Sequence, residues 1–332
     1  MKNKKLLVTG STGYIGGTFS YEALKSGYEV IGIDNFSNSK KATKQILDNF
    51  INFTFYEIDI SKNLKKVNEI ISKTKPDVII HFAGLKSVSE SEKNQNLYWQ
   101  NNILSTLNIL ESIKNNNISL IFSSSATVYG DKNESPIPEE AKFSTNSAYG
   151  STKLAQELLI SDYSRAYDIS CISLRYFNPV GTHADKLIIE DIMSSPNNLM
   201  PRILRVAKKI DEKISIYGNR YPTKDGTGER DYIHISDLVN GHFAALKKIN
   251  GMDNHNFFNL GTGKKTSVLE LIRTFENVND IKIKFDYKSE REGDVAICYA
   301  DPSLAKKELD WTATKTINEM CVDAWKGVKD GD

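Results

Sequence analysis

The segment Thr9-Gly10-Ser11-Thr12-Gly13-Tyr14-Ile15-Gly16 follows the apolar stretch Lys5 to Thr9 and leads into a helix-length segment. Glycines are needed where a backbone turns sharply, where it approaches a pyrophosphate and where a helix packs on a strand. The N-terminus of such a helix offers N–H groups and the positive end of its dipole to phosphates. Because the spacing is G-x-x-G-x-x-G rather than G-x-G-x-x-G, a purely structural glycine turn stays open as an alternative.

The second predicted strand ends in an acidic residue, Asp34, eighteen residues after Gly16. A carboxylate at this place binds the hydroxyls of an adenosine ribose. It would also repel a 2′-phosphate, so NAD is favoured over NADP. The alternative for Asp34 is a turn residue at the end of the strand.

Outward from this loop, short apolar strands alternate with helix-length segments. Several strands are nearly continuous apolar runs, which is typical of a parallel sheet covered on both faces. After Asn178 loop-forming residues become more frequent. We predict an α/β protein with a Rossmann-like, doubly wound parallel sheet and a smaller C-terminal α/β substrate domain. The dinucleotide-binding domain is expected at 1–180, with 231–260 returning to it, and the substrate domain at 181–230 and 261–332. The predicted strands are Lys5 to Thr9, Glu29 to Asp34, Phe53 to Ile58, Val78 to Phe82, Leu120 to Ser123 and Cys171 to Tyr176.

A candidate catalytic pair, Tyr149 and Lys153, is spaced four residues apart, which puts both side chains on one face of a helix. A free tyrosine has a pKa near ~10 and is a poor base at neutral pH. A lysine ammonium, together with a positive nicotinamide ring, would favour the phenolate. Ser125 lies just past the carboxyl end of a strand, where open α/β sheets bind ligands. A polar loop is the alternative for the serine run there.

Composition excludes several classes of protein. Of the 332 residues, 39% are hydrophobic, which is too many for a disordered protein. The net charge of +1 gives no overall electrostatic attraction to nucleic acid or to a membrane surface. Three widely spaced cysteines fit neither a disulfide framework nor a zinc cluster, which suggests a reducing compartment. The apolar run after Met1 to Lys5 is too short for a signal peptide, and no stretch reaches membrane-spanning length. We expect a cytoplasmic protein without a metal, a nucleic-acid partner or a membrane partner.

Taken together, these residues resemble the extended short-chain dehydrogenase/reductase family, and within it the UDP-galactose 4-epimerases. The later motifs are much more specific than the glycine loop. The matching stretches run in order along almost the whole chain: Thr9 to Gly16, His81-Phe-Ala-Gly-Leu-Lys86, Phe122 to Gly130, Tyr149-Gly-Ser-Thr-Lys153, Arg175-Tyr-Phe-Asn-Pro-Val-Gly181, Asn197-Asn-Leu-Met-Pro201, Tyr221 to His234 and Arg291-Glu-Gly-Asp294.

The resemblance implies a role for each matching position. Tyr149 is expected to be the general base and acid, Lys153 to adjust its pKa and bind the cofactor ribose, and Ser125 to bond the sugar 4-oxygen. NAD is expected to contact Gly10, Gly13, Tyr14, Ile15, Gly16, Asp34, Asn35, Asp59, Ile60, Phe82, Ala83, Gly84, Lys86, Asn101, Tyr149, Lys153 and Tyr176. The UDP-sugar is expected to contact Lys86, Ser125, Ala126, Thr127, Tyr149, Tyr176, Phe177, Asn178, Asn198, Leu199, Ile216, Tyr217, Arg230, Arg291, Asp294 and Cys298.

The activity implied by the resemblance is reversible C4 epimerisation of UDP-glucose and UDP-galactose, through a 4-keto intermediate and with tightly bound NAD. Arginines such as Arg230 and Arg291 can clamp a diphosphate with forked hydrogen bonds, although each one alone would suit a surface salt bridge. Cys298 stands where some family members carry a bulky tyrosine beside the sugar. The smaller side chain leaves room for an N-acetyl group, so we also expect UDP-GlcNAc and UDP-GalNAc as substrates; a small buried residue without this role is the alternative.

Other functions stay open: a 4,6-dehydratase, a decarboxylase, or a regulator that binds NAD or a UDP-sugar without catalysis. Related dehydratases carry an acidic pair directly after the serine or threonine, where this chain has Ala126 and Thr127. A pure binder would not need a base such as Tyr149. The resemblance also implies a homodimer formed by helices near 101–114 and 149–167. Leu154 and Leu158 are suitably spaced for it, unless they pack within their own chain.

Overall fold

The computed structural model describes residues 4–193, 198–252, 254–291 and 294–329, which form two compact units. Unit 1 comprises Met1–Gly130, Thr145–Arg175 and His242–Phe258. Unit 2 comprises Asp131–Ser144, Tyr176–Gly241 and Asn259–Asp332. The positions 1–3 of the basic N-terminus, and the motif residues Asn197, Glu292 and Gly293, lie outside the described residues.

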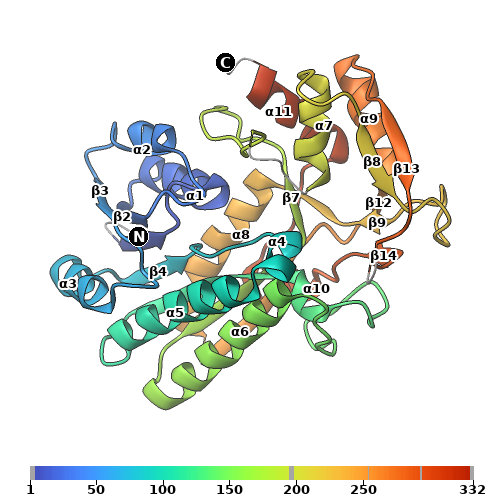
Figure 1. Ribbon diagram of the computed structural model, residues 1–332. Helices are drawn as coiled ribbons and strands as arrows, with labels where there is room; N and C mark the ends of the chain where they lie inside the picture. The colour runs from blue at the N-terminus through green and yellow to red at the C-terminus, as the bar shows by residue number, and fades with distance from the viewer. Residues whose placement is uncertain (1–3, 194–197, 253, 292–293, 330–332) are drawn as a thin grey trace. The chain divides into compact units, whose positions relative to one another are not determined.

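Unit 1 is built on a seven-stranded sheet with the order β11-β6-β5-β4-β1-β2-β3 (Figure 1). The pairs β1–β2, β1–β4, β2–β3 and β4–β5 are all parallel. The predicted Rossmann-like α/β fold is confirmed, and so are its six predicted strands. Their ends differ slightly: β3 and β4 each end one residue earlier than expected, and β5 begins one residue earlier and ends two residues later. The strands are β1 (Lys5–Thr9), β2 (Glu29–Asp34), β3 (Phe53–Glu57), β4 (Val78–His81), β5 (Ser119–Ser125), β6 (Cys171–Tyr176) and β11 (His255–Leu260).

The strand order places a topological switch point beside β1. The chain continues from β1 to β2 and β3 on one side of it, and then returns to β4 and β5 on the other side. In open α/β sheets, ligands bind outside the carboxyl ends of the strands at such a point. Helices connect the strands, and α5 and α6 lie side by side (Figure 1). The helices are α1 (Tyr14–Lys25), α2 (Lys41–Leu47), α3 (Leu64–Thr74), α4 (Val88–Lys93), α5 (Gln95–Ile113) and α6 (Ala148–Tyr167), with the 3₁₀ turns η1 (Ala126–Tyr129) and η2 (Ile249–Gly251).

The core of unit 1 holds this arrangement in place. Leu7, Ile79 and Leu120 of three neighbouring strands pack in one cluster with Ile109 of α5 and Ile160 of α6, and all five are fully buried. Burial of a side chain of this size stabilises the fold by about 1.5–3 kcal/mol. The carboxyl ends of β1, β4 and β5 are therefore fixed relative to α5 and α6.

Unit 2 contains three small sheets: β10–β7, β12–β9–β14 and β13–β8. Its core packs α7, α9 and α11 together, with Ile203, Phe275 and Cys321 fully buried. Its strands are β7 (Asn178–Val180), β8 (Ile214–Tyr217), β9 (Glu229–Arg230), β10 (Tyr232–His234), β12 (Thr266–Ser267), β13 (Phe285–Lys288) and β14 (Ile297–Cys298). Its helices are α7 (Leu199–Ala207), α9 (Val268–Asn279), α10 (Ser303–Leu309) and α11 (Ile317–Lys329), while α8 (Ile235–Lys248) runs on into unit 1. Across the described residues, no helix combines the length and the apolar character needed to cross a membrane.

Candidate active site

The glycine loop joins β1 to α1, and its three glycines have different constraints. Gly10 adopts a φ of +68°, and a Cβ there would lie 2.9 Å from the backbone nitrogen of Ala83. A Cβ on Gly16 would lie 2.2 Å from the carbonyl oxygen of Gly10. At Gly13, the N-cap of α1, a Cβ would come no closer than 3.4 Å to a described atom, and no side chain caps the helix. The loop therefore leaves room in front of the α1 N–H groups, where a phosphate fits.

Asp34 is fixed beside this loop at the end of β2. Its buried carboxylate accepts hydrogen bonds from the backbone nitrogens of Thr12, at 3.1 Å, and Phe36, at 2.9 Å. It also accepts from the Ser39 hydroxyl at 2.8 Å. The next side chain, Asn35, accepts from the backbone nitrogen of Ser37. An oriented carboxylate next to the loop suits the hydroxyls of a ribose.

The segment after β4 runs beside β1 at the switch point. Ala83 donates its backbone N–H to Thr9 Oγ1 at 3.2 Å, and a Cβ on Gly84 would lie 3.9 Å from Lys153 Nζ. The atom closest to that Cβ would be Asn102 Oδ1, at 3.2 Å, so Gly84 lies against Asn102 and in ordinary contact distance of the predicted catalytic lysine. The predicted cofactor residues Tyr14, Ile15, Phe82 and Asn101 are half-buried in the same unit, and Lys86 is exposed.

Asp59 and Ile60 follow β3. Burial alone would raise the pKa of Asp59, but hydrogen bonds from Ser61 and Lys62 bring it below its usual value. Ile60 packs in the core of unit 1, and its carbonyl oxygen accepts from Asn108 Nδ2 at 2.7 Å. The side chain of Ile60 is thus committed to packing, and its carbonyl oxygen is engaged by Asn108.

Tyr149, Lys153 and Ser125 come together within unit 1. The Tyr149 side chain is 9% exposed and forms a hydrogen bond with the Ser125 side chain. Lys153 is 3% exposed, and its Nζ donates to the carbonyl oxygen of Ser123 at 2.7 Å. The same Nζ lies 4.6 Å from the ring centroid of Phe122 and 6.0 Å from that of Tyr149. The predicted spacing on α6 therefore produces a compact phenol–ammonium–hydroxyl group at the end of β5.

Burial dominates the protonation of this group. It raises the pKa of Tyr149 to about 12, and the Ser125 hydrogen bond offsets only part of the rise. It lowers the pKa of Lys153 to about 7, against a smaller opposing effect of the Glu157 charge. Lys153 is not among the causes of the Tyr149 shift, and its Nζ is directed to the Ser123 carbonyl oxygen. The lowering expected from an ammonium together with a positive nicotinamide ring stays a prediction.

A buried hydroxyl next to this group lacks a partner. The η1 turn starts directly after Ser125, whose Oγ accepts from the backbone nitrogen of Thr127 at 3.3 Å. Thr127 Oγ1 is buried and has no hydrogen-bond partner among the described residues. Buried hydroxyls are rarely left unpaired, so this atom is suited to a polar ligand group. With Ala126 before it, the turn presents no carboxylate at the two positions after Ser125.

Unit 2 gathers several of the predicted substrate residues in a polar cluster. Arg230 forms an ion pair with Asp294 and donates to the Glu229 carbonyl oxygen at 2.9 Å. The guanidinium of Arg291 lies 3.9 Å from the ring centroid of Tyr217. The two pairs are linked, because the backbone nitrogen of Asp294 donates to the carbonyl oxygen of Arg291 at 3.1 Å. The cluster thus combines two guanidinium groups with a carboxylate, which suits a diphosphate and ribose hydroxyls.

The other predicted substrate residues of unit 2 have mixed surroundings. Asn198 is the N-cap of α7, its side chain forms no capping bond, and Leu199 begins the helix. Asn178 Nδ2 donates to the Asp231 carbonyl oxygen at 2.8 Å, and Cys298 lies opposite Arg230 in the β14–β9 register. Tyr176 and Phe177 are buried. Ile216 is also buried, in the hydrophobic core of unit 2, so the structure does not bring its side chain to the polar cluster.

Comparison with known proteins agrees with this geometry. The chain matches the GDP-mannose 4,6-dehydratase family model over residues 7–324. It is 42% identical over 327 residues to the UDP-glucose 4-epimerase of Bacillus subtilis, which covers 97% of this chain and 96% of the relative. The chain belongs to the UDP-glucose 4-epimerase family of extended short-chain dehydrogenases/reductases. This confirms the family predicted from the motifs.

Solved structures of this family superpose closely on the chain. The UDP-glucose 4-epimerase from Stenotrophomonas maltophila, with bound NAD and formylated UDP-arabinopyranose, gives a TM-score of 0.94 at 38% identity and covers 98% of each chain. The UDP-Glc/GlcNAc 4-epimerase from Campylobacter jejuni gives a TM-score of 0.87 at 30% identity. It covers 98% of this chain and 99% of its own.

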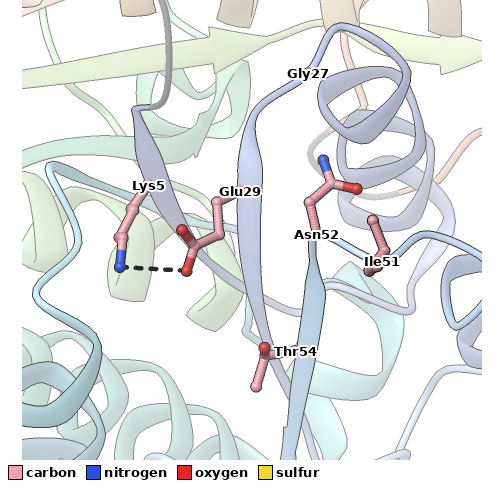
Figure 2. A pocket seen from close by; sticks show the side chains of 6 residues that line it. All are labelled: Lys5, Gly27, Glu29, Ile51, Asn52 and Thr54. Carbon is pink, nitrogen blue, oxygen red and sulfur yellow. Dashed lines mark ion pairs between the residues drawn. The ribbon is translucent and has the colours of Figure 1, made fainter.

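A pocket of about 420 Å³ lies elsewhere in unit 1, at the amino ends of β1 and β2 (Figure 2). Lys5 and Glu29 line it and form an ion pair at 3.4 Å, while Ile51 beside them is fully exposed. The glycine loop and Asp34 stand at the opposite ends of these strands. Since ligands of this family's fold bind at the carboxyl ends, this pocket is separate from the candidate site.

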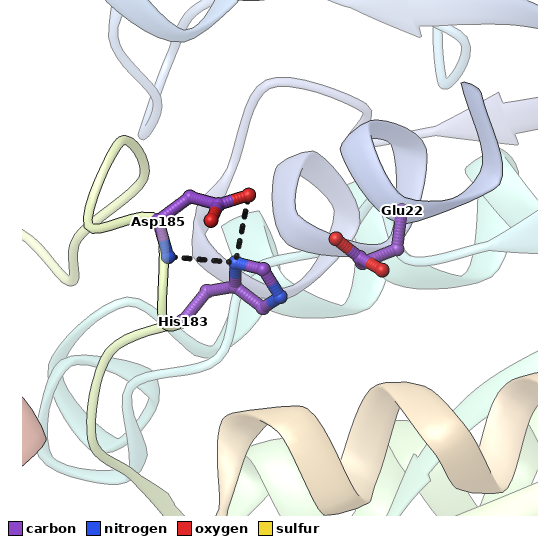
Figure 3. A group of neighbouring side chains, drawn as sticks. All are labelled: Glu22, His183 and Asp185. Atoms are coloured by element: carbon purple, nitrogen blue, oxygen red, sulfur yellow. Dashed lines mark hydrogen bonds and ion pairs between the residues drawn. The ribbon is translucent and has the colours of Figure 1, made fainter. Parts of the chain in front are cut away.

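His183 and Asp185 lie on one loop of unit 2 (Figure 3). The backbone nitrogen of Asp185 donates to His183 Nδ1 at 3.3 Å, and a carboxylate oxygen lies 3.9 Å from the same nitrogen. A metal site needs several converging ligands, and Nδ1 already accepts a backbone bond. Glu22, also drawn in Figure 3, belongs to α1 in the other unit. We assign no metal site to this loop.

Sequence reasoning did not single out three side chains that the structure places beside candidate residues. Arg202 of α7 donates a hydrogen bond to Tyr217, which together with Arg291 lowers the pKa of that tyrosine. Its position one helical turn after Asn198 was the available signal. Glu157 lies one turn after Lys153 on α6, and Arg175 of β6 pairs with it at 2.8 Å. Arg175 opens the motif Arg175 to Gly181 but was given no role, and nothing in the sequence distinguished Glu157 from an ordinary helix position.

Proposed function

We propose that this protein is an NAD-dependent isomerase that interconverts UDP-glucose and UDP-galactose by inverting C4 of the hexose. The observation that carries the proposal is the meeting of Tyr149, Ser125 and Lys153 at the carboxyl end of β5. Further support comes from the identity to UDP-glucose 4-epimerases over nearly the whole chain.

The residues of unit 1 fit NAD. The α1 N-terminus with the open position at Gly13 would hold the pyrophosphate, and Asp34 the adenosine ribose. Lys153 would hold the ribose next to the nicotinamide, since its Nζ is directed to the end of β5. When bound, NAD supplies the acceptor and donor of the hydride at C4 of the sugar. The relative from Stenotrophomonas maltophila contains NAD, which supports the same cofactor here.

The side chains then perform the proton chemistry. Tyr149 takes the proton of the 4-hydroxyl as the 4-keto sugar forms and returns it afterwards, while Ser125 orients the 4-oxygen. The unpaired Thr127 hydroxyl offers a further hydrogen bond to the sugar. The polar cluster of unit 2 around Arg230 and Arg291 would hold the diphosphate while the hexosyl group rotates to present its opposite face. On this proposal, unit 1 provides the cofactor site and unit 2 contributes the UDP-binding residues.

The proposal is tested by incubating the protein with UDP-galactose without added NAD and separating the products. We expect UDP-glucose, and we expect Tyr149→Phe to lower kcat by at least about 10²–10³-fold, because the general base is lost. UDP binding by the variant, measured by calorimetry, should stay within twofold of wild type. A Tyr149→Phe variant with a near wild-type rate would remove Tyr149 from its role. A deoxy product in place of the epimer would favour a dehydratase, the activity that the family model names.

The substrate range is proposed to include UDP-GlcNAc and UDP-GalNAc. Cys298 is half-buried in β14, next to Arg230 of the diphosphate cluster, so the sugar would lie beside a small side chain. The similar UDP-Glc/GlcNAc 4-epimerase of Campylobacter jejuni supports this range. We expect Cys298→Tyr to lower kcat/KM for the acetylated pair at least tenfold more than for UDP-glucose and UDP-galactose. Equal losses on both pairs would contradict a steric role for Cys298.

A homodimer is proposed to form through α5 and α6. Leu97, Leu104 and Leu158 on these adjacent helices are 49%, 41% and 58% exposed, and Leu158 is therefore not part of its own core. Burying such leucines against a second copy would stabilise the pair. Sedimentation equilibrium should give twice the mass of the chain, and a monomer at micromolar concentration would contradict the proposal. A cytoplasmic location also remains a prediction.

A further inference from the structure

Three successive serines at the end of β5 contact three successive turns of α6. Ser125 bonds Tyr149, the Ser123 carbonyl oxygen accepts from Lys153 at 2.7 Å, and the Ser124 hydroxyl donates to Glu157 Oε1 at 2.5 Å. The three α6 residues are spaced by four, so they lie on one face of the helix. The first two contacts belong to the proposed reaction. The third, between Ser124 and Glu157, touches no reacting group.

The third contact is part of a buried hydrogen-bond network. Glu157 is 2% exposed and Arg175, on β6, is 1% exposed. Arg175 Nε donates to Glu157 Oε1 at 2.9 Å and Nη2 to Oε2 at 2.8 Å, a forked pair with both charges buried. Arg175 Nη1 also donates to the Tyr129 hydroxyl at 2.9 Å. Since Tyr129 ends the η1 turn, this network holds the chain on both sides of Ser125.

We propose that Glu157 is a positioning residue for the reaction: through Ser124 and Arg175 it sets the register of β5 and η1 against α6, and so keeps Ser125 on Tyr149 and the Ser123 carbonyl on Lys153. The inference rests on the proposed function for its kinetic consequence, but its geometric part concerns the chain alone. Glu157 touches neither substrate nor cofactor in this assignment. Its effect reaches the catalytic side chains through the neighbours of Ser124 on β5: Ser123, which contacts Lys153, and Ser125, which contacts Tyr149.

The charge of Glu157 has a second effect, on Lys153. Among the described groups, Glu157 is the one whose charge raises the Lys153 pKa, against the burial that lowers it to about 7. Facing the lysine from β4, His81 has its pKa lowered to about 3 by burial and by Lys153 itself, so it is neutral at pH 7. The Arg175 charge on β6 is paired with Glu157, and Glu92 on α4 accepts the Ala148 backbone N–H at the start of α6. Glu157 thus favours the ammonium form of Lys153.

Two variants separate positioning from charge. Ser124→Ala removes the hydroxyl tether but leaves the Glu157–Arg175 pair in place. We expect kcat for UDP-galactose to fall about tenfold, with KM within twofold, because small displacements of reacting groups cost this much or more. The pH at which activity declines on the alkaline side should not move. Glu157→Gln should lower kcat similarly and also move that decline to lower pH, because Lys153 loses its proton earlier without the carboxylate.

Ser164→Ala is the matched control, because Ser164 is equally buried on α6 and its hydroxyl bonds the Ile169 carbonyl oxygen, at 2.7 Å, and the Cys171 side chain, away from Tyr149 and Lys153. Its kcat should stay within twofold of wild type. Equal losses in Ser124→Ala and Ser164→Ala, or a wild-type kcat in Ser124→Ala, would overturn the inference. If Glu157→Gln does not fold, Ser124→Ala alone decides.

Crystal structures make the inference independent of the proposed function. Ser124→Ala should lose or lengthen the hydrogen bond between Ser125 and Tyr149, while Ser164→Ala should keep it. If the wild-type protein converts no UDP-sugar, the proposed function fails, yet this structural comparison still decides whether the tether positions Ser125. An unchanged Ser125–Tyr149 contact in Ser124→Ala would refute it.

Discussion

Alanine substitutions at two glycines of the cofactor loop should separate chain packing from NAD binding. In Gly16→Ala the new Cβ would lie 2.2 Å from the Gly10 carbonyl oxygen and 3.0 Å from its carbon, whereas ordinary contact begins at 3.4 Å. Both neighbours are backbone atoms, so the loop must shift against α1. Overpacking of this kind costs about 1–3 kcal/mol, and we expect the free energy of unfolding to fall by that amount.

Gly13→Ala should behave in the opposite way. Gly13 has φ −76° and ψ 177°, which any residue adopts, and a Cβ there meets the Gly10 carbonyl oxygen at an ordinary 3.4 Å. Restricting the unfolded chain at a compatible position stabilises a protein by about 0.4–1 kcal/mol. The methyl group nevertheless occupies the space in front of the α1 N–H groups. We expect NAD affinity to fall at least about tenfold, which corresponds to roughly 1.4 kcal/mol.

The assay compares two quantities for wild type and both variants: the free energy of unfolding in urea, and the NAD released per mole of purified protein after denaturation. Gly16→Ala should lose both stability and NAD, whereas Gly13→Ala should lose NAD alone. A Gly13→Ala protein that retains a full complement of NAD would refute the assignment of the α1 N-terminus as the pyrophosphate site. A loss of stability as large as that of Gly16→Ala would refute the steric reasoning instead.

Two further predictions concern stability. Burial, and then the Arg175 charge, lower the pKa of His255 from 6.5 to about 3, so its contribution to stability is complete above pH 6.5 and is lost as the pH falls towards 3. His255→Gln should therefore lose less unfolding free energy than wild type between pH 7 and 5 in urea titrations; an equal loss would exclude His255 as a source of acid sensitivity. Ser267 caps α9 by accepting from the Glu270 backbone nitrogen at 3.0 Å. Ser267→Ala should cost about 1 kcal/mol in the same measurement at pH 7, and no change would mean that the cap is dispensable.

The parts of this protein that sequence predicted are those fixed by local chemistry. The glycine loop, the six strands and the Tyr149–Lys153 spacing depend on residues close together in the chain, and the structure shows the expected loop and strands, with Tyr149 and Lys153 both on α6. The identities of the residues at the loop follow from backbone sterics, as the close approach of Gly16 to Gly10 shows. At Gly10 and Gly16 such constraints are visible in a sequence because a Cβ would approach backbone atoms too closely, whereas the backbone of Gly13 accepts any residue.

Other features depend on contacts between distant segments. The segment Asp131–Ser144 belongs to unit 2 because Ile137 bridges to Ala300 and its carbonyl oxygen accepts from Asn259 Nδ2 at 2.9 Å. No local pattern announces such a pairing. Glu157 likewise reads as an ordinary helix residue until Arg175 and Ser124 are seen to enclose it. Burial itself is of this kind, and it is the burial of Tyr149 that raises the pKa of its own hydroxyl.

The opposite pKa shifts of Tyr149 and Lys153 have one cause, because burial favours the neutral form of both groups. A tyrosine with a pKa of about 12 is a poor base at neutral pH, so the fold alone does not produce a phenolate. A positive charge bound beside the Tyr149 hydroxyl would lower the pKa of Tyr149 and also the pKa of Lys153. The second change favours loss of the Lys153 proton. Glu157 opposes only the second of these changes directly, since it lies one turn beyond the lysine and two turns beyond the tyrosine. A buried carboxylate at this position thus opposes the loss of the Lys153 proton that a cationic ligand at Tyr149 would favour.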